Sequence, residues 1–244
     1  MAQGETGFRM GRRVSAGRWW TLAPRRAGST FAGVLFAALA AITVVPAPTA
    51  PAVAAELELH NPFRPCAADC AVTVLSGGLV ETAMMDIFVN QGIPPWKWKY
   101  GRSAFIGAAI SRELVTWGNY GSIEGEIGIG KRFGIMDEGE GWVALYFRWK
   151  WFPWNDYVRT TIATSTGVNV ATDIADWERK RTVNSGRGSY HQHYFSPEIT
   201  FGLPQYPNTD LVFRFHHRSG ASLGIFNHTY GAAQYATVGV RHRF

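Results

Sequence analysis

Alternating apolar and polar residues, interrupted at short intervals by turn signals, dominate the chain after residue 55. The stretch from residue 211 to residue 219 is the clearest case. Because alternate residues of a β-strand share a face, one face here carries three large apolar side chains followed by His217 and Ser219. The other face carries Arg214, His216 and Arg218, and it is too cationic for lipid or for an apolar core. If the apolar face meets lipid, His217 and Ser219 lie where polar groups are costly, which indicates function.

The same pattern predicts eight strands along the chain. Residues that favour turns separate them, and an even number of antiparallel strands is what closure into a barrel requires. Pro197 falls inside the sixth strand and should leave one ladder position without a donor. We expect the strands at residues 70–86, 103–114, 120–134, 141–152, 160–175, 190–203, 209–221 and 234–244.

Charged residues fall on the inner face of several predicted strands. The interior of an eight-stranded barrel is just wide enough for side chains to fill it. A buried charge network is therefore expected there rather than a pore. Its members should be Glu124, Glu126, Arg148, Arg214 and Arg241.

Two aromatic and basic segments, at residues 94–100 and 177–181, fall between predicted strands. Their tryptophans and cations suit the headgroup level of a membrane. Solvated loop tips have a similar composition, so both interpretations stay open.

The first 55 residues have the layout of a secretory leader. Six arginines precede the 15-residue apolar run from Phe31 to Val45, and small residues follow it. This run is shorter than the roughly 20 residues that a spanning helix needs, so a retained anchor is the weaker interpretation. An internal start at Met10 or a twin-arginine route would explain the long basic segment, and the internal start suits a barrel exported unfolded. We expect residues 1–55 to be removed and residues 56–244 to form one barrel domain.

Removal of the leader changes the charge of the protein. The whole chain has a formal net charge of +6, but the leader holds six of the arginines and one of the glutamates. The remaining domain is close to neutral. The basic pI of the whole chain therefore does not indicate nucleic-acid binding.

The composition of the remaining domain restricts its class. No apolar run is long enough for a transmembrane helix, which excludes a helical membrane protein. Dense glycine and aromatic residues on alternating strands leave an outer-membrane barrel or a soluble β-protein, such as a β-sandwich or a lipocalin-like binder. The last predicted strand ends in Phe244, and this terminal aromatic resembles the C-terminal signal of outer-membrane barrels.

The sequence offers no convincing metal site. Cys66 and Cys70 are the only cysteines, and in an exported protein this pair favours a small local disulfide. Two thiols without a nearby histidine make a poor zinc site. His191, His193 and His242 lack metal-like spacing with a carboxylate, and we interpret them as loop or interface residues.

Three motifs, taken in order, resemble the eight-stranded outer-membrane lipid A 3-O-deacylases and their acyloxyacyl hydrolase relatives. The family carries a His-x-Ser motif on the exterior of its penultimate strand, and His217-Arg218-Ser219 takes that place here. The resemblance implies an all-β, eight-stranded antiparallel transmembrane barrel in the bacterial outer membrane, with lipid A or lipopolysaccharide acyl chains as its partner. The motifs are Glu124-Gly125-Glu126-Ile127-Gly128, Lys131-Arg132-Phe133-Gly134 and His216-His217-Arg218-Ser219-Gly220.

The activity implied by this resemblance is ester hydrolysis without a metal or cofactor. Ser219 would attack an ester carbonyl, while His217 would take the serine proton and return it to the departing sugar hydroxyl. Residues i and i+2 of a strand stand about 7 Å apart along it. An imidazole at one position can therefore lean toward a hydroxyl at the other.

The sequence departs from the family at the residue that orients the histidine. The family has a glutamate on the last strand, whereas no acidic residue follows Asp210 here. Gln234 has the right parity and is expected beside His217, where it can accept a hydrogen bond but cannot stabilise an imidazolium by charge. A triad aspartate changed to asparagine lowers turnover by about 10⁴-fold, so a comparable loss is expected here. Glu198 cannot take this place, because its position in the alternation points its side chain into the barrel.

A second departure concerns the oxyanion site. The family commonly has asparagine after the serine, and Gly220 stands at that position here. The donor would have to be a backbone N–H at the strand end or Asn227 of the following loop.

The alternative function is a non-catalytic barrel that stiffens the membrane or offers its loops for adhesion. In that case His217 and Ser219 are an ordinary polar strand end at the membrane interface. His216, Arg218 and His228 would be equally unremarkable there.

Overall fold

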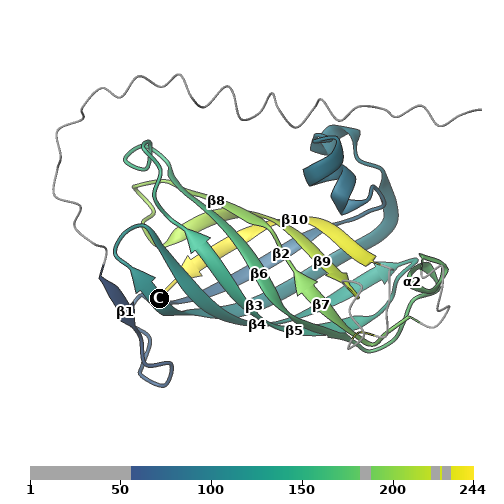
Figure 1. Ribbon diagram of the computed structural model, residues 1–244, viewed down its shortest axis with the longest axis horizontal. Coiled ribbons are helices and arrows are strands. Elements are labelled where there is room, and N and C mark those ends of the chain that lie inside the picture. The colour runs from purple at the N-terminus through teal and green to yellow at the C-terminus, as the bar shows by residue number, and fades with distance from the viewer. Residues whose placement is uncertain (1–55, 182–187, 221–225, 227–231) are drawn as a thin grey trace, which may run out of the picture. The chain divides into compact units, whose positions relative to one another are not determined.

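The computed structural model describes residues 56–181, 188–220, 226 and 232–244. The proposed leader and its cleavage site lie outside these residues. The described strands form one antiparallel sheet that curls into a barrel (Figure 1). No helix in this part of the chain is long and apolar enough to cross a membrane.

The described elements are mostly strands. The helical pieces are the π-helical turn η1 (Asp86–Asn90), the 3₁₀ turn η2 (Pro95–Lys97) and the short helix α2 (Asp176–Arg181). The strands are β1 (Leu57–Leu59), β2 (Cys70–Val80), β3 (Tyr100–Trp117), β4 (Gly121–Gly134), β5 (Gly139–Trp149), β6 (Arg159–Ala171), β7 (His191–Phe195), β8 (Glu198–Gly202), β9 (Thr209–Ser219) and β10 (Ala232–Arg243).

The sheet closes through the ladder between β10 and β2, which runs from Tyr235 opposite Leu79 to Arg243 opposite Ala71. Each strand from β2 to β6 pairs with the next, and β7 and β8 both lie between β6 and β9. Counting β7 and β8 as one strand, the described residues form a ring of eight strands. This confirms the predicted fold class.

The sixth expected strand is interrupted between β7 and β8, at Ser196 and Pro197. Pro197 has no N–H to give to the ladder, yet its carbonyl accepts a hydrogen bond from Phe215 N at 2.9 Å. The proline therefore divides the strand without opening the ring.

Several other features differ from the expectation, among them the ends of β3 and β5. The first strand ends at Val80 rather than at residue 86, because residues 81–99 leave the wall and form η1 and η2. The fifth strand ends at Ala171 rather than at residue 175. The short strand β1, which pairs with residues 115–117 of β3, was not expected.

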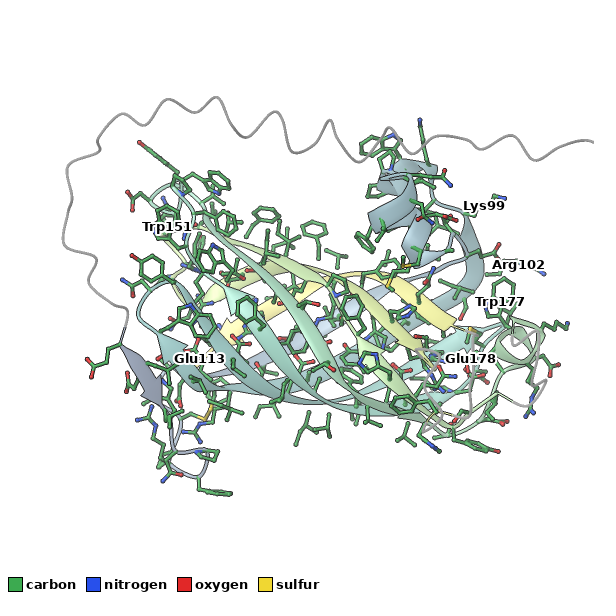
Figure 2. All side chains as sticks on the ribbon, viewed as in Figure 1. Lys99, Arg102, Glu113, Trp151, Trp177 and Glu178 are labelled. Carbon is green, nitrogen blue, oxygen red and sulfur yellow. A yellow bond between two sulfur atoms is a disulfide. The ribbon has the colours of Figure 1, made fainter. Side chains whose placement is uncertain are left out.

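The two ends of the barrel differ. Glu113 and Trp151 lie at the end where the chain terminates, whereas Lys99, Arg102, Trp177 and Glu178 lie at the opposite end (Figure 2). We call the latter the α2 end. β9 runs from the C-terminal end to the α2 end, so Ser219 lies at the α2 end.

Alternation of burial along the strands separates an apolar exterior from a polar interior. In β5, for example, Val143, Leu145 and Phe147 are exposed and Trp142, Tyr146 and Arg148 are buried. The exposed apolar side chains form what we call the outer belt. Its members include Val72, Val74, Ile106, Ile110, Ile127, Ile129, Val143, Leu145, Phe147, Leu211, Phe213, Val238 and Val240.

The interior holds the charge network that the sequence predicts. Arg148 bonds Glu124 at 2.7 Å and Glu198 at 2.8 Å. Arg214 lies 2.8 Å from Glu126 and 2.6 Å from Glu198, and Arg241 lies 2.9 Å from Glu124. Glu198 joins the five expected members because its parity points it inward. The pairing compensates charges whose burial would otherwise be costly.

Gly128 of β4 makes room in this interior. A Cβ built at Gly128 would lie 2.1 Å from the Trp142 ring, so a larger residue would displace that ring. Trp142 Nε1 in turn donates to Glu126 at 2.8 Å. Gly128 therefore leaves room for the Trp142 ring inside the barrel.

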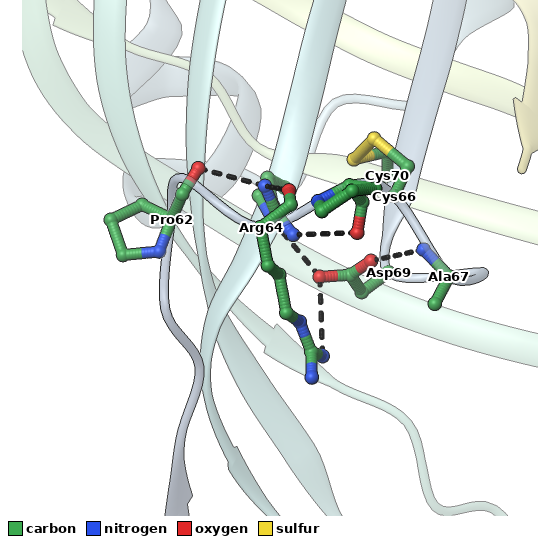
Figure 3. Close-up of a disulfide and its surroundings, with 8 residues drawn as sticks. Pro62, Arg64, Cys66, Ala67, Asp69 and Cys70 are labelled. Atoms are coloured by element: carbon green, nitrogen blue, oxygen red, sulfur yellow. Dashed lines mark hydrogen bonds and ion pairs between the residues drawn. A yellow bond between two sulfur atoms is a disulfide. The ribbon is translucent and has the colours of Figure 1, made fainter.

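A disulfide joins Cys66 and Cys70 just before β2 (Figure 3), which confirms the expected pairing. Asp69 anchors the same segment, because it accepts hydrogen bonds from Ala67 N at 2.8 Å and from Arg112 Nε at 3.0 Å.

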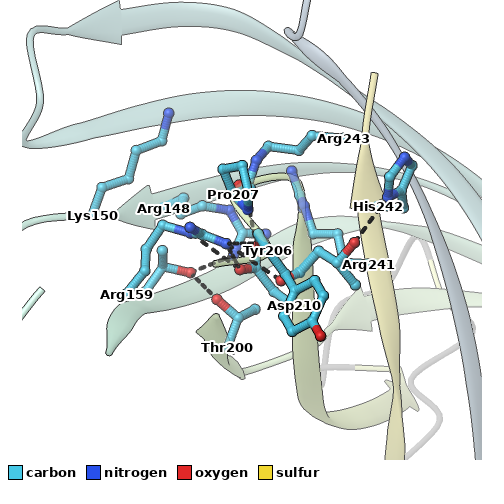
Figure 4. Close-up of polar contacts among 12 residues, drawn as sticks. Arg148, Lys150, Arg159, Thr200, Tyr206, Pro207, Asp210, Arg241, His242 and Arg243 are labelled. Carbon is cyan, nitrogen blue, oxygen red and sulfur yellow. Dashed lines mark hydrogen bonds and ion pairs between the residues drawn. The ribbon is translucent and has the colours of Figure 1, made fainter. Parts of the chain in front are cut away.

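The β8–β9 turn at the C-terminal end is fixed by Asp210, which lies between two arginines (Figure 4). Arg159 bonds one carboxylate oxygen at 2.5 Å, and Arg243 contacts the other. The same two guanidinium groups bond the carbonyls of Tyr206 and Pro207. The turn is therefore held in place at the end opposite Ser219.

Candidate active site

The outer face of β9 changes character toward the α2 end. Leu211 and Phe213 are exposed members of the outer belt, whereas Phe215 and His217 are buried and Ser219 is half-buried. Arg214, His216 and Arg218 point into the barrel. His217 and Ser219 thus share the exterior face, as their parity indicates.

Gln234 of β10 lies directly opposite His217 in the β9–β10 ladder. Its Oε1 is 3.2 Å from His217 Nδ1, which is hydrogen-bond distance. The Gln234 amide nitrogen donates to the carbonyl of Thr82. The amide therefore joins the histidine to the segment that leaves β2.

Residues 81–99, which we call the roof, cover this part of the wall. The helical turns of the roof lie outside the barrel (Figure 1). Phe88 and Trp98 contact the Phe215 ring edge-on, with centroid distances of 5.3 and 5.7 Å. Ile87 is buried with Val80 and Phe215 in one apolar cluster.

The roof explains why an exterior histidine is shielded. The ring of Phe215 stacks toward the ring of His217 at 6.4 Å, and His217 is only 4% exposed. Within the segment at residues 94–100, Trp98 packs on the barrel wall, and the placement of this segment at the headgroup level stays a prediction. Trp96 remains 81% exposed.

Ser219 is not hydrogen-bonded to His217 within the described residues. Its ladder partners are Ala232 of β10 and His193 of β7. Gly220 is buried, while Asn227 and His228 lie outside the described residues. A backbone donor at Gly220 is therefore the oxyanion candidate that the structure describes.

A second charge cluster fills the interior behind these residues. Arg132 lies 3.1 Å from Glu178 of α2 and also pairs with Glu140, and Arg218 Nε lies 3.5 Å from Glu178. Glu178 therefore reaches from α2 into the barrel, which the expectation of a loop at residues 177–181 did not include, while Arg179 and Lys180 of that segment are exposed.

His216 is part of this interior cluster rather than of the exterior site. Its Nε2 contacts Glu140, and its Nδ1 lies 3.1 Å from the Tyr194 hydroxyl. Sequence reasoning did not find the Glu140 contact, because the two residues lie 76 positions apart. The carboxylate that holds a histidine in this region faces His216, not His217.

No group of three histidine, cysteine, aspartate or glutamate side chains within the described ranges is arranged to hold a metal ion. The chemistry available on the exterior consists of a hydroxyl, imidazoles and a carboxamide. These groups suit proton transfer and nucleophilic attack.

The chain is similar to several solved structures at low sequence identity. No protein-family profile and no curated protein matches the chain. The outer membrane enzyme PagL is 13% identical with a TM-score of 0.45, covering 71% of this chain and 99% of that chain. Neisserial surface protein A is 8% identical with a TM-score of 0.44, covering 73% and 98%. Ail, the attachment invasion locus protein of Yersinia pestis solved with a heparin analogue, is 11% identical with a TM-score of 0.32, covering 72% and 97%.

Proposed function

We propose that this chain is a bacterial outer-membrane esterase that removes an ester-linked acyl chain from lipid A. The observation that carries the proposal is the hydrogen-bond contact between His217 Nδ1 and Gln234 Oε1, on the same exterior face as Ser219. A histidine with an orienting acceptor, two residues from a serine, is the arrangement that the deacylase resemblance leads one to expect.

The outer belt supports a place in the outer membrane. Valine, isoleucine, leucine and phenylalanine side chains are exposed over several neighbouring strands, a surface that lipid would cover and water would not favour. The proposed route to this membrane is export with the leader at residues 1–55, leaving residues 56–244 as the barrel domain.

The proposed reaction uses residues of this chain alone. Ser219 Oγ bonds to the ester carbonyl carbon as His217 Nε2 accepts the hydroxyl proton. The bond from that carbon to the sugar oxygen then breaks, and the histidine protonates the leaving oxygen. A water molecule next attacks the acyl-serine, which releases a fatty acid and restores the hydroxyl.

An exterior site suits this substrate. The acyl chains of lipid A can remain in hydrocarbon while the ester carbonyl meets Ser219 at the α2 end, where water can enter. Gln234 holds the His217 ring but supplies no negative charge. The proposal therefore includes slow turnover, because an imidazolium beside an amide is less stable than one beside a carboxylate.

A specific observation favours a second candidate, a structural or adhesive barrel without catalysis. His217 is covered by the roof, and it shares no hydrogen bond with Ser219 in the part of the chain described here. A polar strand end of this kind needs no chemistry to explain it.

Mass spectrometry of lipid A from cells with and without the protein tests the two candidates. The esterase predicts loss of one hydroxyacyl chain, abolished by Ser219→Ala and by His217→Ala. Ser76→Ala is the matched control, since it removes an exterior hydroxyl from β2. Unchanged lipid A, with the folded protein present in purified outer membrane, would favour the structural barrel.

A further inference from the structure

Ser219 has a second histidine beside it, on the neighbouring strand. His193 of β7 is the direct ladder partner of Ser219. Directly opposite residues of an antiparallel pair have Cβ atoms about 4.5–5.5 Å apart, whereas same-face residues of one strand are separated by about 7 Å. By backbone register, His193 is closer to Ser219 than His217 is.

The burial pattern of β7 places His193 on the barrel exterior. Gln192 and Tyr194 are fully buried, while His193 is half-buried between them. Its ring lies 6.2 Å from that of Phe226. His193 therefore keeps part of its surface exposed on the barrel exterior, and it lies beside Phe226, which is buried.

One nitrogen of His193 already has a partner on the next strand. Nε2 lies 3.0 Å from Oγ1 of Thr166, an exposed residue of β6. When Nε2 carries the proton and donates it to Thr166, Nδ1 keeps its lone pair. Among the described residues, Nδ1 of His193 has no hydrogen-bond partner, so it is free to accept a proton.

Among the described residues, few groups near His193 other than this ring titrate. On the exterior these are His191 of its own strand and His217 of β9. The neighbouring residues of β6, Thr166 and Val168, carry no titratable group. A pH dependence that vanishes with His193 would therefore identify this ring.

We infer that His193 is a second general base for Ser219, an inference that rests on the proposed ester hydrolysis. As Ser219 Oγ bonds to the carbonyl carbon, its proton passes to His193 Nδ1. The carbon–oxygen bond to the sugar breaks, and that proton moves to the leaving oxygen. In the second half, the same nitrogen takes a proton from the attacking water and returns it to Ser219 as the fatty acid leaves.

A base at His193 would avoid two features of His217 that hinder its action as a base. The His217 ring is held by Gln234 and shielded by Phe215, whereas His193 is partly open and oriented by a hydroxyl. A general base contributes about 10²- to 10⁴-fold to such a reaction. Two bases at one serine would also explain how function survives without the family's glutamate.

The experiment measures phosphonylation of Ser219 by a fluorophosphonate probe, with fluoride as the leaving group, and acyl release from lipid A, across pH 5–9 in outer-membrane vesicles. His193→Gln should slow both reactions at least about 10-fold and remove a titration from the pH profile. His191→Gln, two residues away on the same face, is the matched control and should leave the rate and the profile unchanged. Heat-modifiable gel mobility verifies that each variant is folded.

Thr166→Val provides a second route if His193→Gln does not fold. This substitution leaves both histidines in place and removes only the hydroxyl that contacts His193 Nε2. If His193 is a base, the pH dependence of the two rates should therefore shift. Wild-type rates and profiles in both variants, with activity abolished by His217→Gln, would overturn the role of His193 alone. A folded wild-type protein that neither labels at Ser219 nor releases acyl chains would overturn both proposals.

Discussion

Gln234 contacts two parts of the molecule at once: its Oε1 lies 3.2 Å from His217 Nδ1, and its Nε2 donates to the carbonyl of Thr82. One carboxamide therefore sets the position of the histidine and fastens the roof above it. A carboxylate in its place could perform only the first task, because it has no N–H to give to Thr82.

Gln234→Glu is expected to raise esterase turnover and lower stability. A carboxylate would stabilise the His217 imidazolium, and the analogous change in a triad is worth up to about 10⁴-fold. The lost bond to Thr82 leaves a carbonyl without its donor and costs about 1–3 kcal/mol. Acyl release from lipid A and urea unfolding measure the two effects. Gln234→Leu is the control for both, and equal turnover in all three proteins would contradict a role for this position.

Trp98→Ala is expected to uncover His217. The Trp98 ring packs on Phe215, and its Nε1 donates to the carbonyl of Ile93 at 2.7 Å. Truncation of a packed tryptophan costs about 3–5 kcal/mol, so the roof should open more often and modification of His217 by diethylpyrocarbonate should accelerate at least about tenfold. Peptide mass mapping locates the modified ring. The exposed Trp96→Ala is the control, and equal modification in both variants would show that the roof does not shield the ring.

Glu198→Gln is expected to destabilise the barrel strongly. Glu198 lies between Arg148 and Arg214, at 2.8 and 2.6 Å, and all three side chains are buried. Removing one partner of a buried ion pair costs about 3–5 kcal/mol. Urea unfolding followed by tryptophan fluorescence measures the loss. Glu58→Gln, with its side chain 68% exposed, is the matched control; a loss below about 1 kcal/mol at Glu198 would contradict the network.

Cys66→Ser with Cys70→Ser is expected to loosen the segment before β2 without unfolding the barrel. The disulfide closes a very short loop, for which chain entropy gives only about 2 kcal/mol. Asp69 should hold the segment at neutral pH. Burial alone would raise the pKa of Asp69, but the Ala67 N–H and the Arg112 guanidinium outweigh it and lower the pKa.

The pH dependence of this variant follows from the lowered pKa of Asp69. The carboxylate stabilises the segment above the ordinary aspartate pKa, and that stabilisation is lost as the pH falls through the lowered value. Proteolysis between residues 60 and 68, probed with an acid-active protease, should therefore increase in the double variant at low pH. The intact disulfide is the comparison, and resistance of the double variant throughout would contradict the role of Asp69.

Alternation with period two was sufficient to predict the ring and the face on which each key residue lies. It put Glu124 and Arg214 inside, and it put His217, Ser219 and Gln234 outside, because parity depends only on neighbouring residues. The register between β9 and β10 then followed from the two strand patterns.

The roof and α2 could not be predicted in the same way. Thr82 and Gln234 are 152 positions apart, and nothing local in residues 81–99 specifies that they fold onto the wall. Glu178 looked like part of a basic surface loop until its distant partners, Arg132 and Arg218, were known. The sequence predicts a loop or interface residue at His193, because the spacing around it is not that of a metal site. Its position beside Ser219 depends on the pairing of β7 with β9, which local sequence does not specify.

The alternation of side chains along β9 also restricts which insertions this strand can tolerate. Insertion of one codon between Phe215 and His217 would turn His217 and Ser219 inward and bring Arg218 to the exterior. Insertion of two codons would preserve the faces. Among descendants of this sequence, tolerated insertions in β9 should therefore contain an even number of residues. Insertions in the turn that follows β9 can contain an odd or an even number.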